Sequence, residues 1–419
     1  MKQQKIKTSQ VFVPGGFPHI TYISREEHRL EERVSLAQDN LTKLMIVTGP
    51  TKSGKTVLVD RIFPQESAIW IDGGTISDEQ SFWDLIVEKL KLFTISECSK
   101  SDGNSSELQG TVSAETNLFL VKGGAKVSGK VEANKTFIQT SSRSVSTKTA
   151  VISALRAKLI PLIVDDFHYI TKPIQKNLVR ALKAPIMHGL PVIFIAIPNR
   201  KYDAVEVERE MTGRIENIEM PIWSEDELAN IAKQGFTALN VEVKDNLRHK
   251  LTNAALGSPF LMQEFCKAFC IHSKINERSD IIQYISDKID ESDIFADIAE
   301  HSGRSMFEKL KRGPRARTDR IPRLLTDGTT ADIYGVVMSG LKSLQPGVES
   351  VPYDILRLNI KNVVAEDPPQ RHEISRVLDK IAEISYSDSS STPVIDWQKD
   401  EDILTITDPF FAFFLKWAR

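Results

Sequence analysis

Residues 44–56, LMIVTGPTKSGKT, decide the fold. An apolar run typical of a buried strand ends at Gly49 and is followed by the spacing G-x-x-x-x-G-K-T. Glycines let such a loop curl, so that successive backbone N–H groups and the N-terminus of the next helix converge on an anion. The sequence therefore predicts a strand, a phosphate-binding loop (P-loop) and a helix, in that order.

The residues of this loop are candidate ligands of a nucleotide. In this motif the lysine, Lys55, reaches the β- and γ-phosphates, and the Thr56 hydroxyl is placed to bind Mg²⁺. The candidate binding residues are Gly49, Pro50, Thr51, Lys52, Ser53, Gly54, Lys55 and Thr56. An ordinary glycine-rich turn is the alternative, and the strand before it and the helix after it argue against that reading. ATP and Mg²⁺ are the expected cofactors.

A second apolar run, LIVDD at 162–166, ends in two acidic residues. Adjacent carboxylates at the end of a buried strand are costly without a cation. We expect Asp165 to hold Mg²⁺ through water, and Asp166 to orient or deprotonate the attacking water as a catalytic residue. In isolation the same pair could cap the following helix.

Further short apolar runs at 67–74 and 190–198, with the run at 159–167 that contains LIVDD, alternate with helical segments. Short apolar strands that alternate with helices are typical of a parallel sheet covered on both faces. The sequence therefore predicts an α/β fold, with a P-loop NTPase sheet followed by a helical domain and a C-terminal winged helix.

Three polar residues downstream are candidates for the reaction. Ligand chemistry gathers beyond the carboxyl ends of parallel strands, so Asn199 and Arg200 are placed to sense the γ-phosphate. A solvated loop arginine is an equally good interpretation of Arg200. Arg214 is a candidate arginine finger that reaches the nucleotide of a neighbouring subunit.

The rest of the chain divides by composition. A Ser-, Gly- and Lys-rich insertion at about 96–146 contains a predicted β-hairpin around Gly123 and Gly124, either a surface decoration or a partner surface. We predict a core at 1–221, a helical lid at 222–298, a basic linker at 299–330 and a winged helix at 331–419. The winged helix is predicted from three helical segments followed by two β-like ones, with an apolar helix closing the chain.

The overall charge and the number of cysteines exclude several classes of protein. Lys and Arg number 54 against 56 Asp and Glu, so any nucleic-acid surface must be local. Three cysteines cannot build a disulfide framework, and no Cys/His cluster has zinc spacing. The N-terminus lacks the apolar region of a signal peptide, and no run approaches a membrane span. We expect a soluble, cytoplasmic protein with no membrane partner.

Together these motifs resemble the AAA+-related P-loop ATPases, and more narrowly the STAND class of signal-transduction ATPases. The narrower resemblance rests on Gly257-Ser258-Pro259, which is similar to the GxP motif of their helical domain, and on the Asn199-Arg200 pair. It implies that Pro259 packs beside the adenine, and that Tyr22 and Arg25 line the adenine pocket. It covers about residues 20–419, apart from the insertion.

The sequence also departs from that class. Typical STAND proteins carry long sensor repeats and a fused effector, and this chain shows neither. The resemblance therefore implies a stand-alone ATPase switch that assembles with itself or engages a separate effector protein. Small members of this kind look most like components of bacterial antiviral defence.

The alternative is a DNA-acting AAA+ ATPase, such as a transposition target selector or a loader. It rests on the winged helix and on the basic stretch 304–323. The third winged-helix segment, 370–385, mixes basic and acidic residues, which makes a poor recognition helix and favours contact with protein. A binding module with a vestigial ATPase is a third class, which the intact motif residues argue against.

Overall fold

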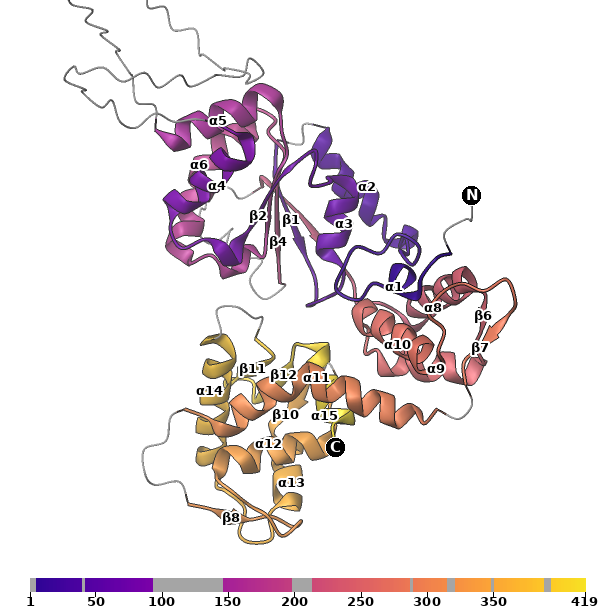
Figure 1. Cartoon of the computed structure of the whole chain (residues 1–419). Helices are drawn as coiled ribbons and strands as arrows, with labels where there is room; N and C mark the ends of the chain where they lie inside the picture. Colours follow the sequence, from indigo (N-terminus) through magenta and orange to yellow (C-terminus); the bar gives the residue numbers. More distant parts are fainter. Residues whose placement is uncertain are drawn as a thin grey trace, which may run out of the picture.

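The computed structural model describes residues 5–39, 42–92, 146–197, 213–286, 289–314, 321–347, 350–387 and 393–419. They form an α/β core, a helical part and a C-terminal part (Figure 1). The hairpin predicted around Gly123 and Gly124, and the candidates Asn199 and Arg200, lie outside the described residues.

The core is built on a parallel sheet with the strand order β2-β3-β4-β1-β5. Its strands are β1 (Leu44–Thr48), β2 (Ile69–Asp72), β3 (Leu162–Asp165), β4 (Val192–Ala196) and β5 (Ile215–Glu219). The first four match the predicted apolar runs. The sequence analysis missed β5, because this edge strand alternates polar and apolar residues and only Ile218 is fully buried.

Helices cover both faces of this sheet (Figure 1). One face carries α2 (Leu30–Ser35) and α3 (Lys55–Ile62), and the other carries α4 (Glu79–Leu90), α5 (Thr147–Lys158) and α6 (Lys172–Met187). Single turns of 3-10 helix lie at Glu26–His28, Leu36–Gln38, Gly73–Thr75 and Phe167–Tyr169. Apolar side chains of the sheet pack against both layers, which confirms the predicted α/β class.

The helical part follows β5. It contains α8 (Glu225–Leu239), α9 (Asp245–Ala254) and α10 (Pro259–His272), with the short strands β6 (Val241–Glu242) and β7 (Gln283–Tyr284). The N-terminal helix α1 (Thr8–Val11) packs here, since Val11 and Phe12 belong to the same apolar core as α8 and α10. The start of the chain therefore ties the helical part to the segment that enters the α/β core.

The C-terminal part has the elements predicted for a winged helix. Its helices are α12 (Ile333–Leu344), α13 (Tyr353–Val363), α14 (Arg371–Ser387) and α15 (Pro409–Trp417). Its strands β10 (Ser350–Pro352), β11 (Ile395–Gln398) and β12 (Ile403–Ile406) form an antiparallel sheet in the order β10-β12-β11. A separate small ladder joins β8 (Arg323–Leu324) to β9 (Thr330–Ala331).

The prediction of a basic linker at 299–330 is wrong for residues 299–312. Residues 291–312 form one helix, α11 (Glu291–Arg312), which runs from the helical part into the C-terminal part (Figure 1). Its apolar residues enter two cores: Ile294 and Phe295 pack in the helical part, and Phe307 and Leu310 pack with α12–α15. Burial of apolar positions along its whole length makes this basic segment a helix instead of a linker.

The last helix, α15, also belongs to both cores. Phe410 and Phe413 pack in the helical part, whereas Phe411 and Phe414 pack in the C-terminal part. It lies so close to α11 that a Cβ at Gly303 would come 2.2 Å from the Cβ of Phe414. Because α11 and α15 each enter two cores, the helical and C-terminal parts form one packed unit.

Among the described helices, none has the length and apolar character needed to cross a membrane.

Candidate nucleotide-binding site

The predicted P-loop lies at the carboxyl end of β1 and leads directly into α3. Gly54 precedes α3 with φ 96°, a left-handed conformation that strongly favours glycine. At Gly49 a Cβ would come 2.8 Å from the Cβ of Met220, so the loop also needs glycine for close approach to the segment after β5. Glycine is therefore needed at these two positions of the motif for different structural reasons.

Lys55 is buried at the base of the loop. Its ammonium donates to the carbonyl oxygens of Gly49 at 3.0 Å and Pro50 at 2.8 Å. Burial lowers the pKa of Lys55 to about 8, and the carboxylates of Asp166 and Asp165 oppose that shift. A buried cation whose hydrogen bonds to the described residues go to two neutral carbonyls favours an incoming anion.

Thr56 and Asp165 meet as the sequence predicted. The Thr56 hydroxyl donates to Oδ2 of Asp165 at 2.8 Å, and Oδ1 accepts from the backbone N–H of Asp166 at 2.9 Å. Burial raises the pKa of Asp165, while these two hydrogen bonds lower it. A hydroxyl and a carboxylate at contact distance supply oxygen ligands that suit Mg²⁺.

Asp166 follows the strand in a left-handed conformation with φ 49°. Burial and the neighbouring Asp165 raise its pKa to about 6. The turn after β2 approaches it closely, since a Cβ at Gly73 would come 2.4 Å from the Asp166 carbonyl oxygen. A carboxyl group whose pKa lies near neutrality can take a proton from water at physiological pH.

Lys55, Thr56 and Asp166 line a cavity of about 630 Å³ at the junction of all three parts of the molecule. Its walls include Tyr22 and Lys55 of the core, Pro259 of α10, Gly303 of α11 and Phe410 of α15. Beside it the Ser53 hydroxyl is buried with no hydrogen-bond partner among the described residues. The buried cation, the Thr56–Asp165 pair and this spare hydroxyl fit a phosphorylated ligand with a divalent cation.

Tyr22 and Pro259 lie on the cavity wall, where the resemblance places the adenine. The Tyr22 hydroxyl donates to Glu31 at 2.7 Å, and the Arg61 guanidinium lies 4.2 Å from its ring centroid. Burial raises the pKa of Tyr22 above its ordinary value. Its ring is thus held in a fixed orientation, and adenine contact remains a prediction for both residues.

Arg25 also borders the cavity, but protein groups occupy its donors. It forms two hydrogen bonds with Glu227, at 2.6 and 2.9 Å, and donates to the carbonyls of Pro221 and Ile222. Its side chain is 3% exposed. We therefore assign Arg25 to joining the core to the start of α8, and its place at the adenine stays a prediction.

Loss of the Arg25–Glu227 pair should lower the free energy of unfolding. Arg25→Leu leaves the Glu227 carboxylate partly buried without its cation, and we expect a loss of about 2–3 kcal/mol in the free energy of unfolding. Urea titration measures it, with Arg29→Leu as the control, because the Arg29–Glu32 pair is exposed and its loss should change stability little. Equal losses in the two variants would contradict the assignment.

Arg214 lies at the other end of the sheet from the P-loop. Its carbonyl accepts from the Leu44 N–H at the start of β1, and its guanidinium donates to the sulfur of Met187 at 2.8 Å. It therefore does not join this chain's own cavity. Its role toward the nucleotide of a neighbouring subunit stays a prediction.

The sequence analysis missed four residues of the site. Asp72, at the end of β2, adds a negative charge that raises the pKa values of Asp165 and Asp166. Trp223 donates its indole N–H to the Ser53 carbonyl at 2.8 Å. Asp408 and Phe410 reach the loop from α15. Only Asp72 had a local signal, an acid at the end of an apolar run.

Comparison with known proteins supports the fold. The chain is similar to a Walker-type ATPase of Pyrococcus abyssi, with 14% identity and a TM-score of 0.51 over 94% of this chain and 96% of that one. The fold is that of a P-loop NTPase.

Other solved structures are less similar. They include Cdc6p of Pyrobaculum aerophilum, with 12% identity and a TM-score of 0.44 over 99% of this chain and 98% of that one. The Orc2 protein of Aeropyrum pernix has 13% identity and a TM-score of 0.46, over 99% of this chain and 97% of that one. No family model matches the chain, and no curated protein matches it.

Proposed function

We propose that this chain is an ATP-binding and ATP-hydrolysing molecular switch. The observation that carries the proposal is a contact between the P-loop and the last helix. The Lys52 ammonium lies 3.5 Å from the ring centroid of Phe410 and 4.0 Å from Oδ2 of Asp408, the N-cap of α15. The loop that would cradle phosphates thus holds the C-terminal part in its present position.

Phosphate in the cradle would weaken this contact. Asp408 is 7% exposed and accepts from the N–H groups of Phe410 and Phe411, so its carboxylate is held facing Lys52. Phosphate oxygens would compete with Asp408 for Lys52 and repel its negative charge. A triphosphate carries more charge than a diphosphate, so ATP would oppose the contact more strongly than ADP.

The moving body would be the helical and C-terminal parts together, since α11 and α15 enter both cores. The core and this unit are joined by two stretches of chain, residues 12–29 between α1 and α2 and residues 220–224 between β5 and α8. Domain rotation about a short segment is a common way for a bound ligand to change a surface. Release of Lys52 would uncover the P-loop side of α15.

In this proposal Mg²⁺ would be held at Thr56 and Asp165, where it would offset charge on the phosphates. Lys55 binds phosphate oxygens, and Asp166 orients a water molecule and takes its proton. Arg214 of a neighbouring subunit is the candidate finger, and Asn199 and Arg200 stay candidate sensors of the γ-phosphate. Hydrolysis would restore the state in which Lys52 meets Asp408.

The uncovered surface is proposed to bind a second copy of this chain or a separate effector protein, as in STAND-like switches. An antiviral role follows only from that resemblance. Light scattering of the purified chain without nucleotide, with ADP·Mg²⁺ and with a non-hydrolysable ATP analogue tests self-assembly. We expect larger particles with the analogue alone, and unchanged mass in all three conditions contradicts the self-assembly form of the proposal.

A charge-removing variant sharpens that test. Asp408→Asn keeps an N-cap for α15 but removes the charge that faces Lys52, so we expect assembly at roughly tenfold lower analogue concentration. Asp290→Asn is the matched control, since Asp290 caps α11 and its carboxylate accepts from the Ser292 N–H at 2.9 Å. Identical assembly curves for the two variants would show that the Asp408 charge does not oppose assembly.

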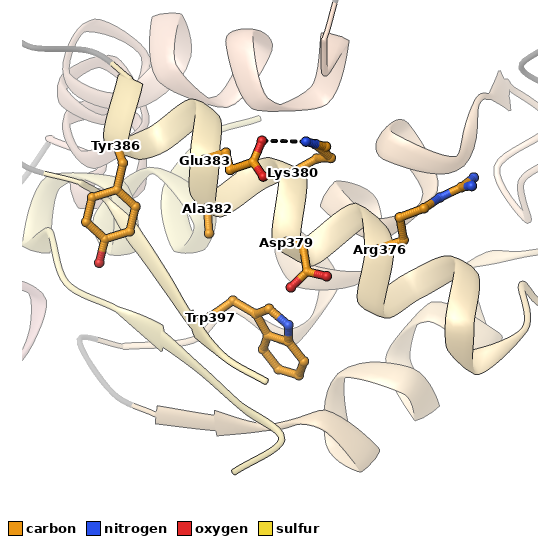
Figure 2. A pocket seen from close by; sticks show the side chains of 7 residues that line it. All are labelled: Arg376, Asp379, Lys380, Ala382, Glu383, Tyr386 and Trp397. Atoms are coloured by element: carbon orange, nitrogen blue, oxygen red, sulfur yellow. Dashed lines mark hydrogen bonds and ion pairs between the residues drawn. The ribbon is translucent and has the colours of Figure 1, made fainter. Parts of the chain in front are cut away.

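DNA binding is the second candidate function, and it rests on the basic end of α11. The face of α14 argues against it (Figure 2). Lys380 donates to Glu383 at 2.6 Å, Lys399 pairs with Asp379 at 3.1 Å, and Arg371 pairs with Asp402. These acidic partners would repel phosphates. Tight binding of duplex DNA at physiological salt would favour this candidate over the protein switch.

A further inference from the structure

Trp223 connects the P-loop to the helical part. It lies between β5 and α8, and its indole N–H donates to the Ser53 carbonyl at 2.8 Å. Ser53 is 2% exposed and immediately precedes Gly54. Because a trans peptide is planar with its C=O and N–H pointing in opposite directions, this bond turns the Gly54 N–H away from Trp223.

The same indole ring also contacts Arg25, which joins the core to the helical part. The Arg25 guanidinium lies 4.7 Å from the Trp223 ring centroid. Arg25 in turn holds Glu227, in the first turn of α8. A continuous chain of contacts therefore runs from the P-loop carbonyl through Trp223 and Arg25 to α8.

The backbone beside Trp223 is fixed from a second direction. Gly257, with φ 71°, lies against Ile222, and a Cβ there would come 2.6 Å from Cγ2 of Ile222. The carbonyls of Pro221 and Ile222 accept from Arg25. The backbone that carries the Trp223 indole is thus held by contacts on two sides. The indole can therefore hold the peptide between Ser53 and Gly54 in one orientation.

We propose that Trp223 is a positioning residue that sets the phosphate-binding conformation of the P-loop and passes its changes to α8. This inference rests on the proposed nucleotide binding and adds, through one side chain, a second connection from the loop beside the Lys52–Asp408 contact. A loop that rearranges around phosphate must move the Ser53 carbonyl or carry Trp223 with it. In either case the environment of the indole changes when nucleotide binds.

Trp223→Phe tests the inference, because it keeps an aromatic face for Arg25 and removes the N–H donor. We expect about tenfold weaker binding of ADP and of the ATP analogue by calorimetry, which corresponds to about 1.4 kcal/mol. The control is Trp70→Phe: the Trp70 indole donates to the Phe63 carbonyl at 2.9 Å, in the same core but away from the loop. Its nucleotide affinity should match that of wild type.

Fluorescence gives a readout that a purely structural role would not move. Nucleotide should change the tryptophan emission of wild type and of Trp70→Phe, and the change should be lost in Trp223→Phe. Trp223→His, which restores a ring N–H donor, should recover part of the affinity. Should Trp223→Phe unfold, the fluorescence change and the affinity of Trp223→His decide, and no emission change in wild type overturns the inference.

The outcomes also separate this inference from the proposed function. If wild type binds nucleotide and Trp223→Phe binds it equally well, the inference fails and nucleotide binding stands. Equal weakening in Trp223→Phe and Trp70→Phe also overturns the inference, because the effect is then general. If wild type binds no nucleotide, the proposed function fails and this inference fails with it.

Discussion

Lys55→Ala is expected to weaken the binding of ADP and of a non-hydrolysable ATP analogue by at least about 100-fold. Lys55 is the most deeply buried cation of the P-loop, at 8% residue exposure. Each hydrogen bond to a charged group is worth about 1.5–3 kcal/mol, so the loss of two such bonds to phosphate accounts for this factor. Isothermal titration calorimetry with Mg²⁺ present measures it.

Lys43→Ala is the control, because Lys43 is a partly exposed lysine of the same core that pairs with Glu216. Its nucleotide affinity should stay within a factor of two of wild type, about 0.4 kcal/mol. Binding by Lys55→Ala at wild-type affinity would show that the nucleotide does not bind at the P-loop.

The pH dependence of wild-type binding follows from the same residue. The pKa of Lys55 is about 8 in the nucleotide-free protein, and bound phosphate would raise it. Below pH 8 the lysine is charged in both states, so affinity should not depend on this group. Above pH 8 binding must take up a proton, and affinity should fall by up to about tenfold per pH unit.

Asp166→Asn is expected to lower the ATPase turnover about 100-fold or more while nucleotide binding persists. Asparagine keeps the shape of the side chain but cannot accept the proton of the attacking water, a role worth about 10²–10⁴-fold. The pKa of Asp166 is about 6 in the nucleotide-free protein, so wild-type kcat/KM should fall as the pH drops through 6 and the carboxylate is protonated. Steady-state phosphate release over pH 5–9 measures both effects.

Asp72→Asn provides the matched comparison. Asp72 raises the pKa of Asp166, as Asp165 does more strongly, so its neutralisation should move the acidic limb of the profile to lower pH. The Asp72 side chain also accepts from the Gly74 N–H, a bond that asparagine can keep. Full turnover in Asp166→Asn with an unchanged pH profile would show that another group activates the water.

The core of the site was predictable because its signals are local. Gly49, Gly54, Lys55 and Thr56 lie within eight residues, and the Asp165–Asp166 pair ends a continuous apolar run. In a parallel sheet the carboxyl ends of all strands lie at one edge, so the two motifs were expected at the same edge although β4 separates β1 from β3. The hydrogen bond between Thr56 and Asp165 confirms that expectation.

The contacts that join the three parts could not be predicted in this way. Arg25 finds Glu227, and Lys52 finds Asp408, across hundreds of residues. Residue spacing carries no information about such pairs, so neither contact was predicted. The basic charges of α11 likewise suggested a linker, whereas its apolar residues Ile294, Phe307 and Leu310 enter two cores.

In the proposed switch, ATP separates α15 from the P-loop. Single-molecule energy transfer between dyes tests it, with one dye at Ser67→Cys in the core and the other at Glu401→Cys beside β12. Both positions are exposed, Cys266 and Cys270 are buried, and Cys98→Ser removes the remaining thiol. Immobilised single molecules exclude assembly as a cause of any change.

We expect one efficiency population without nucleotide and with ADP·Mg²⁺. A second population should appear with the ATP analogue and Mg²⁺, and Lys55→Ala should not show it. An unchanged single population at an analogue concentration that saturates binding by calorimetry would contradict the switch.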